Sequence, residues 1–316
     1  MKSKKLSKLI ALMLTVLLVV GITACGGSED TVATETETPS EVVEEELEEV
    51  AEEIEEELEE VAEEIEEELE EEADDADSDL AYIQDKGTLI VGVTEYEPMD
   101  FRDGDDWVGF DAELATMFAE SLGVEVIIQE INWATKEVEL AANTIDCIWN
   151  GMTWSEERAE QMSLSDPYLN NKQALVVRAE EQENYTSVED LAGKQVAAEA
   201  GSAGEKFVIE NLLDSNYVEK NSQLDSLTEL ALNSVDATVV DLIMAEYLTG
   251  KEGSDFGDLV PLPDLLDSED EVFVVAFRQD SDLTDIVNEF FEDLEESGEL
   301  EELAEKYSLT EALITD

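Results

Sequence analysis

The chain has 316 residues and a formal net charge of −69, with 85 acidic and 16 basic residues and no histidine. Such a charge repels nucleic acid and anionic membrane surfaces, so we expect neither as a partner. The lack of histidine removes the commonest general base, most zinc sites and the usual serine and cysteine triads. We therefore expect a protein that is not an enzyme and that needs no metal or other cofactor.

Residues 1–24 are predicted to be a signal peptide. Lysines at the start precede an apolar run over residues 9–20, which is shorter than the roughly 20 residues that span a bilayer. The following Ile22-Thr23-Ala24-Cys25 resembles the bacterial lipobox, in which the cysteine thiol is lipidated. The resemblance implies an exported protein that is lipid-anchored through Cys25 at the outer face of the cytoplasmic membrane. An ordinary signal peptide with a chance cysteine is the alternative.

Residues 25–79 are predicted to be a glutamate-rich spacer. The stretch from Glu29 to Asp79 has no Lys or Arg, and its sequence EEELEEVAEEI at 44–54 recurs unchanged at 55–65. Apolar residues in this repeat are three or four positions apart, which predicts a helical stripe, and an 11-residue period favours a right-handed supercoil. Because the acidic faces lack basic partners, we predict a solvated, partly helical spacer. An oligomerising coil and a loose divalent-cation binder remain alternatives.

The rest of the chain alternates short apolar runs with amphipathic stretches, which predicts an α/β fold. Strands are predicted at 87–93, 124–128, 147–150, 174–177, 195–198, 237–240 and 273–277. Helices are predicted at 111–122, closed by Gly123, and as a pair between 283 and 307, broken near Gly298. Cys147, Trp149 and Trp154 are predicted to be core residues.

Several motifs occur together in a specific order. Tyr96-Glu97-Pro98-Met99 follows the first predicted strand, Gly109-Phe110-Asp111 opens the first helix, and the run 145–168 ends in Ser-Asp-Pro-Tyr. Gly201-Ser202 and then Asp241 follow. Over about residues 82–308, this pattern resembles the polar amino acid-binding proteins of ABC importers, which are bacterial extracellular solute-binding proteins of family 3.

The resemblance implies a two-lobed periplasmic-binding-protein-like fold of type II. Lobe one would comprise 80–178 with 273–316, lobe two would comprise 179–272, and the crossings would lie near 176–180 and 272–278. The implied function is to capture a free polar amino acid and deliver it to the permease of an ABC importer. A dehydratase-like enzyme that acts on small carboxylates and a sensory ligand-binding domain are the alternatives on the same fold.

A zwitterionic amino acid that leaves water needs a partner for each charge. The resemblance assigns the α-carboxylate to Arg158, whose planar fork can donate two parallel hydrogen bonds. It assigns the α-ammonium to Asp241, which follows a predicted strand. The alternatives are a surface arginine in an acidic run and an aspartate that caps a helix.

Other candidate ligand-binding residues follow from the same resemblance: Tyr96, Trp133, Asn150, Gly151, Thr153, Ser202 and Ala203. The two aromatic residues would sandwich the ligand side chain, which Asn150 would also reach. Gly151 and Thr153 would contact the ligand through backbone and hydroxyl groups. Ser202 and Ala203 would offer backbone N–H groups at a helix start, although the family commonly has threonine where this chain has Ala203. Ordinary turn or core roles are the alternatives.

Overall fold

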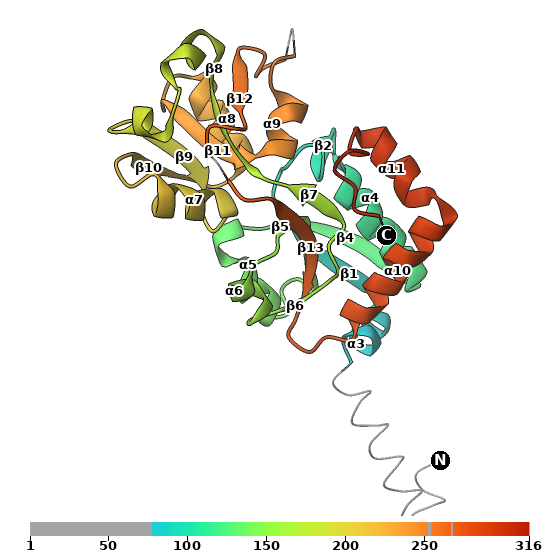
Figure 1. Cartoon of the computed structure of the whole chain (residues 1–316). Coiled ribbons are helices and arrows are strands. Elements are labelled where there is room, and N and C mark those ends of the chain that lie inside the picture. Colours follow the sequence, from blue (N-terminus) through green and yellow to red (C-terminus); the bar gives the residue numbers. More distant parts are fainter. Residues whose placement is uncertain (1–77, 252–253, 267, 316) are drawn as a thin grey trace, which may run out of the picture. The chain divides into compact units, whose positions relative to one another are not determined.

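The computed structural model describes residues 78–251, 254–266 and 268–315 (Figure 1). The predicted signal peptide, Cys25 and all but the last two residues of the predicted spacer lie outside the described residues, so those predictions stay untested. No helix in the described ranges is both long and apolar enough to cross a membrane.

Lobe one is built on a mixed sheet with the strand order β4-β1-β5-β13-β6, in which β7 also pairs with β13. β1 runs parallel to β4 and β5, and β13 runs antiparallel to β5. The strands are β1 (Thr88–Val93), β4 (Glu125–Glu130), β5 (Cys147–Thr153), β6 (Ser163–Leu164), β7 (Leu169–Asn171) and β13 (Glu271–Phe277). A separate hairpin is formed by β2 (Phe101–Asp103) and β3 (Asp106–Val108).

Helices cover both faces of this sheet because side chains alternate along its central strand. In β5, Cys147 and Trp149 belong to one hydrophobic core, and Ile148 and Met152 belong to another. Figure 1 shows α4, α10 and α11 on one side of the sheet and α5 and α6 on the other. The elements that cover the sheet are α3 (Asp79–Lys86), α4 (Phe110–Ser121), η1 (Trp133–Thr135), α5 (Lys136–Ala141), α6 (Glu156–Ala159), α10 (Leu283–Ser297) and α11 (Glu299–Tyr307).

Lobe two contains a second sheet with the order β10-β9-β11-β8-β12. β9 is parallel to β10 and β11, whereas β8 is antiparallel to β11 and β12. Its strands are β8 (Gln173–Arg178), β9 (Gln195–Glu199), β10 (Asn216–Lys220), β11 (Ala237–Asp241) and β12 (Leu259–Leu262). Its helices are η2 (Ala179–Asn184), η3 (Val188–Leu191), α7 (Ala203–Asn211), α8 (Gln223–Ala231) and α9 (Leu242–Leu248).

The two-lobed fold is confirmed, but the crossings lie earlier than predicted. Residues 173–178 form β8 of lobe two, so the first crossing lies at Lys172 between β7 and β8 rather than near 176–180. Residues 271–277 form β13 of lobe one, so the second crossing precedes Glu271 rather than occupying 272–278. An apolar run predicts a strand equally well in either sheet, because its pairing partners are distant in sequence.

Each predicted strand overlaps an observed strand, and the predicted helices correspond to α4 and to the pair α10 and α11, separated by Gly298 at φ 83°. The short strands β2, β3, β6, β7, β10 and β12 were not predicted. Cys147 and Trp149 are fully buried as predicted. The prediction for Trp154 is wrong, because this side chain is 48% exposed beyond the end of β5.

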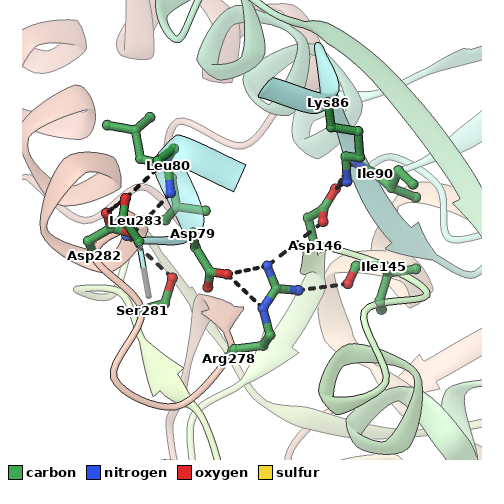
Figure 2. Close-up of polar contacts among 12 residues, drawn as sticks. Asp79, Leu80, Lys86, Ile90, Ile145, Asp146, Arg278, Ser281, Asp282 and Leu283 are labelled. Carbon is green, nitrogen blue, oxygen red and sulfur yellow. Dashed lines mark hydrogen bonds and ion pairs between the residues drawn. The ribbon is translucent and has the colours of Figure 1, made fainter. Parts of the chain in front are cut away.

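The first described residues are attached to lobe one by polar contacts (Figure 2). The Arg278 guanidinium donates to Asp79 Oδ1 at 2.8 and 2.5 Å and to the Ile145 carbonyl at 3.1 Å. Ser78 Oγ donates to Asp282 Oδ2 at 2.5 Å. Asp282 precedes α10, Arg278 follows β13 and Ile145 precedes β5, and all three elements belong to lobe one. The described part of the chain therefore begins at lobe one.

Candidate ligand-binding cleft

One cavity between the lobes brings together all the ligand-binding residues predicted from the sequence. The space between its wall atoms, which includes open solvent at its mouth, is about 270 Å³. Lobe one contributes Tyr96, Trp133, Asn150, Gly151, Thr153 and Arg158, and lobe two contributes Ser202, Ala203 and Asp241, together with the unpredicted Glu199 and Gln223. The cavity wall is therefore polar and carries both signs of charge.

Arg158 places a cation at this cavity. It lies in α6, whose N-terminus is capped by Ser155 Oγ, which accepts from the Arg158 backbone N–H at 3.3 Å. Its guanidinium donates to the carbonyl of Thr153 and, at 3.2 Å, to the carbonyl of Gly201 in lobe two. It forms no ion pair with any carboxylate in the described ranges. Burial lowers the pKa of Arg158, but a guanidinium stays charged at neutral pH.

Asp241 places an anion at the same cavity. It ends β11 and occupies the N-cap position of α9, yet its side chain makes no capping hydrogen bond. Instead, Oδ1 accepts from Asn171 Nδ2 at 2.6 Å and from Gln173 Nε2 at 2.7 Å, and Oδ2 accepts from Gln223 Nε2. Asp241 is 4% exposed, and burial raises the pKa of its carboxyl group while these amides lower it. Three amides thus orient a buried carboxylate.

A second acidic group, Glu271, is the first residue of β13, next to the second crossing, and shares amide donors with Asp241. Its Oε2 accepts from Gln173 Nε2 at 2.9 Å, from Thr153 Oγ1 at 3.2 Å and from Asn171 Nδ2 at 3.4 Å. Burial and then the charge of Asp241 raise the pKa of Glu271 to about 7. The amides of Asn171 and Gln173 therefore hold the two carboxylates in place together.

The start of α7 presents backbone donors from lobe two. Ser202 Oγ caps the helix by accepting from the Glu205 N–H at 3.1 Å. The N–H groups of Ala203 and Gly204 donate to no acceptor in the part of the chain that the structure describes. Unpaired N–H groups at a helix start bind carboxylates well. Ala203, which lacks the hydroxyl common in the family, can still take part through its backbone.

Aromatic rings form the rest of the wall. Tyr96 is 2% exposed and packs edge-to-face on Phe273 with ring centroids 6.4 Å apart. Gly151, at φ 55°, lets this ring approach, because a Cβ there would lie 2.7 Å from Tyr96 Cε1. Trp133 is 5% exposed, and the Lys136 ammonium lies 4.9 Å from the centre of its ring.

Asn150 lines the cavity, but its amide is already fully used within lobe one. Its Nδ2 donates to the Thr94 carbonyl at 3.0 Å and to Asp100 Oδ2 at 2.7 Å. Its Oδ1 accepts from the N–H and the hydroxyl of Thr94, each at 3.0 Å. Both amide protons have acceptors, so the described arrangement leaves no Asn150 donor free for a ligand.

Two cavity residues escaped the sequence prediction. Glu199 ends β9 just before the glycine-rich turn, and that position at the carboxyl end of a strand was a usable signal. Gln223 is the first residue of α8, and only tertiary packing brings its side chain to Asp241, so no local pattern could have revealed it.

Residues 89–310 match the family model of the bacterial extracellular solute-binding proteins, family 3. The chain belongs to this family. It is similar to the arginine-binding extracellular protein ArtP of Bacillus subtilis strain 168, with 32% identity over 225 residues that cover 70% of this chain and 86% of ArtP.

A solved structure supports the same relationship. The amino acid ABC transporter substrate-binding protein AbpA of Streptococcus pneumoniae, bound to L-arginine, matches with a TM-score of 0.66 and 28% identity, covering 72% of this chain and 96% of AbpA. An enzyme is also among the relatives. The cyclohexadienyl dehydratase of Pseudomonas aeruginosa is 26% identical over 172 residues, which cover 53% of this chain and 64% of the dehydratase.

Proposed function

We propose that this protein captures a free polar amino acid in the cleft and delivers it to the permease of an ABC importer as a lipid-anchored extracytoplasmic protein. The observation that carries the proposal is the pairing of Arg158 from lobe one with Asp241 from lobe two at one cavity. The α-carboxylate of an amino acid can pair with the Arg158 guanidinium, and its α-ammonium can pair with the Asp241 carboxylate. Membership of the solute-binding family and the names of the arginine-binding relatives support an amino acid as the ligand class.

The contacts between the lobes also fit ligand capture. The Gly201 carbonyl accepts from Lys136 Nζ at 3.1 Å and from Arg158 Nη2 at 3.2 Å, so two cations of lobe one reach the same backbone group of lobe two. A zwitterion held by Arg158 and Asp241 would add a further link between the lobes. Ligand binding should therefore stabilise the closed arrangement, because it contributes interactions that an open cleft lacks.

A dehydratase-like enzyme is the second candidate function. The dehydratase relative and two buried carboxyl groups near the cleft favour it, since burial raises the pKa of Glu199 to about 8 and that of Glu271 to about 7. Carboxyl groups with such pKa values can act as general acids at neutral pH. Incubation with small carboxylates distinguishes the two functions: an enzyme forms product, whereas a transport protein returns its ligand unchanged.

A thermal-shift screen of the purified protein against the common L-amino acids and cystine tests the proposed function. A ligand at 100 times its Kd should stabilise the folded state by about 2.7 kcal/mol. Hits should then be titrated by calorimetry. If no amino acid changes the melting temperature and none gives a binding isotherm, the proposed function is wrong.

A further inference from the structure

Glu199 is a buried carboxyl group of which one oxygen has no partner among the described protein groups, although a hydrogen bond with the Thr94 side chain also acts on its pKa. It stands at the carboxyl end of β9, is 2% exposed and lines the cavity. Its Oε1 has no hydrogen-bond partner, and it takes part in no ion pair in the described ranges. A buried polar atom without a partner is costly. The described residues contain several such atoms, and Glu199 and Tyr96 are the two residues among them that also line the cavity, where a ligand can supply the missing partner.

The charge of Lys136 lowers the pKa of Glu199, but the two side chains form no ion pair in the described ranges. Lys136 influences the Glu199 pKa, yet its ammonium lies 2.8 Å from Glu137 Oε1 and donates to the carbonyls of Trp133 at 3.2 Å and Gly201 at 3.1 Å. The other charged groups around Glu199 are Asp241 and Asp225, and both repel its negative charge. The surroundings therefore favour a positive charge arriving from the cavity.

The cavity is lined by one basic and two acidic side chains, and an amino acid with a neutral side chain has charged groups for only two of them. Arg158 faces the α-carboxylate and Asp241 faces the α-ammonium in the proposed function, and Glu199 then remains without a counter-charge. A ligand side chain with one positive charge would complete the set. A side chain with a negative charge would leave Glu199 without a counter-charge and would be repelled by it once Glu199 is ionised.

We infer that Glu199 selects amino acids whose side chain carries a positive charge. This inference rests on the proposed function, because it assumes that Arg158 and Asp241 hold the ligand's α-groups. Burial raises the pKa of Glu199 to about 8, so at neutral pH the unliganded protein holds a proton on this group much of the time. Binding of a guanidinium or ammonium side chain displaces that proton, and the carboxylate then accepts hydrogen bonds from the cation.

Glu199→Gln tests the inference, because it keeps the size and removes the ionisable group. Calorimetry should compare L-arginine with L-citrulline, its neutral analogue of similar shape, and should include L-lysine and L-glutamine. We expect the wild-type protein to bind L-arginine or L-lysine at least tenfold more tightly than its neutral counterpart. We expect Glu199→Gln to weaken binding of the cationic ligand at least tenfold and to change binding of the neutral one less than threefold.

Glu219→Gln is the matched control, since Glu219 is an exposed residue of β10 paired with Ala198 of β9 and does not line the cavity. It removes the same charge and should keep the wild-type preference. Tighter wild-type binding of citrulline or glutamine, or an unchanged arginine-to-citrulline ratio in Glu199→Gln, overturns the inference and leaves the proposed function standing. No binding of any amino acid to the wild-type protein overturns the proposed function itself.

Discussion

Replacing Arg158 with glutamine should separate ligand binding from stability. The substitution removes the cation proposed to face the ligand carboxylate. Loss of one partner of a desolvated charge pair costs about 2–5 kcal/mol, which corresponds to a Kd about 30- to 5,000-fold weaker. A ligand bound at micromolar concentration would then bind no better than tens of micromolar.

The same substitution should affect the unliganded fold much less. The Arg158 guanidinium donates to two backbone carbonyls and forms no ion pair in the described ranges, and each such hydrogen bond contributes about 1 kcal/mol net. Glutamine retains one donor group, and the cost of burying an unpaired cation disappears. We expect the free energy of unfolding to change by less than about 2 kcal/mol, which shifts the Tm by a few degrees.

Calorimetric titration of Arg158→Gln and Arg102→Gln, together with their unliganded melting curves, checks this prediction. Arg102 is the control because it is exposed, donates to the Asp105 carbonyl at 3.1 Å and stacks on Trp107 at 4.0 Å. Both substitutions remove one positive charge. Binding by Arg158→Gln within threefold of wild type, or equal losses in both variants, would show that Arg158 does not hold the ligand.

Other regions of the protein give three further predictions. Gly201→Ala should weaken ligand binding at least tenfold and abolish ligand-induced contraction in small-angle scattering, because a Cβ at φ 75° would lie 2.9 Å from Ala134 Cα across the cleft; normal contraction with normal affinity would contradict this. The free energy of unfolding of the unliganded protein should decrease as the pH rises from 5.5 to 8. Glu199 and Glu271, with pKa values of about 8 and 7, keep their protons in the folded state over this range, whereas the unfolded chain releases them near pH 4.5. In chemical denaturation, Glu199→Gln should flatten this slope, and an equal slope in both proteins would refute the assignment. Cys25→Ser should move the protein from membranes to the soluble exported fraction, and retention after washing would exclude the lipid anchor.

Local patterns in the sequence were sufficient to predict the α/β class, seven strands and the helices α4, α10 and α11, whereas the two-lobed arrangement was implied by the family resemblance. Apolar runs such as 195–198 and 237–240 marked strands, and Gly298 marked the break between α10 and α11. These features depend on neighbours in the chain. The sheet to which β8 belongs depends instead on pairing with β11 and β12, which lie more than 60 and 80 residues away, and so the lobe boundary was misplaced.

The site shows the same division between local and tertiary information. The order of the motifs, through the family resemblance, predicted that residues such as Arg158 and Asp241 lie at one site, and both line the same cavity. The saturation of the Asn150 amide by Thr94 and Asp100 could not be foreseen, because those contacts join β5 to the turn after β1. Glu199 follows the predicted strand 195–198 and was not predicted as a site residue; its position after a strand was a usable signal, but its missing partner becomes visible only when the surrounding contacts are known.

Simultaneous recognition of both α-groups is tested most directly by comparing one bound amino acid with two derivatives of it. L-arginine should be titrated alongside agmatine, which lacks the α-carboxylate, and Nα-acetyl-L-arginine, which lacks the α-ammonium. If Arg158 binds the α-carboxylate and Asp241 binds the α-ammonium, each derivative should bind at least 30-fold more weakly than L-arginine. Binding of either derivative as tightly as L-arginine would contradict that arrangement.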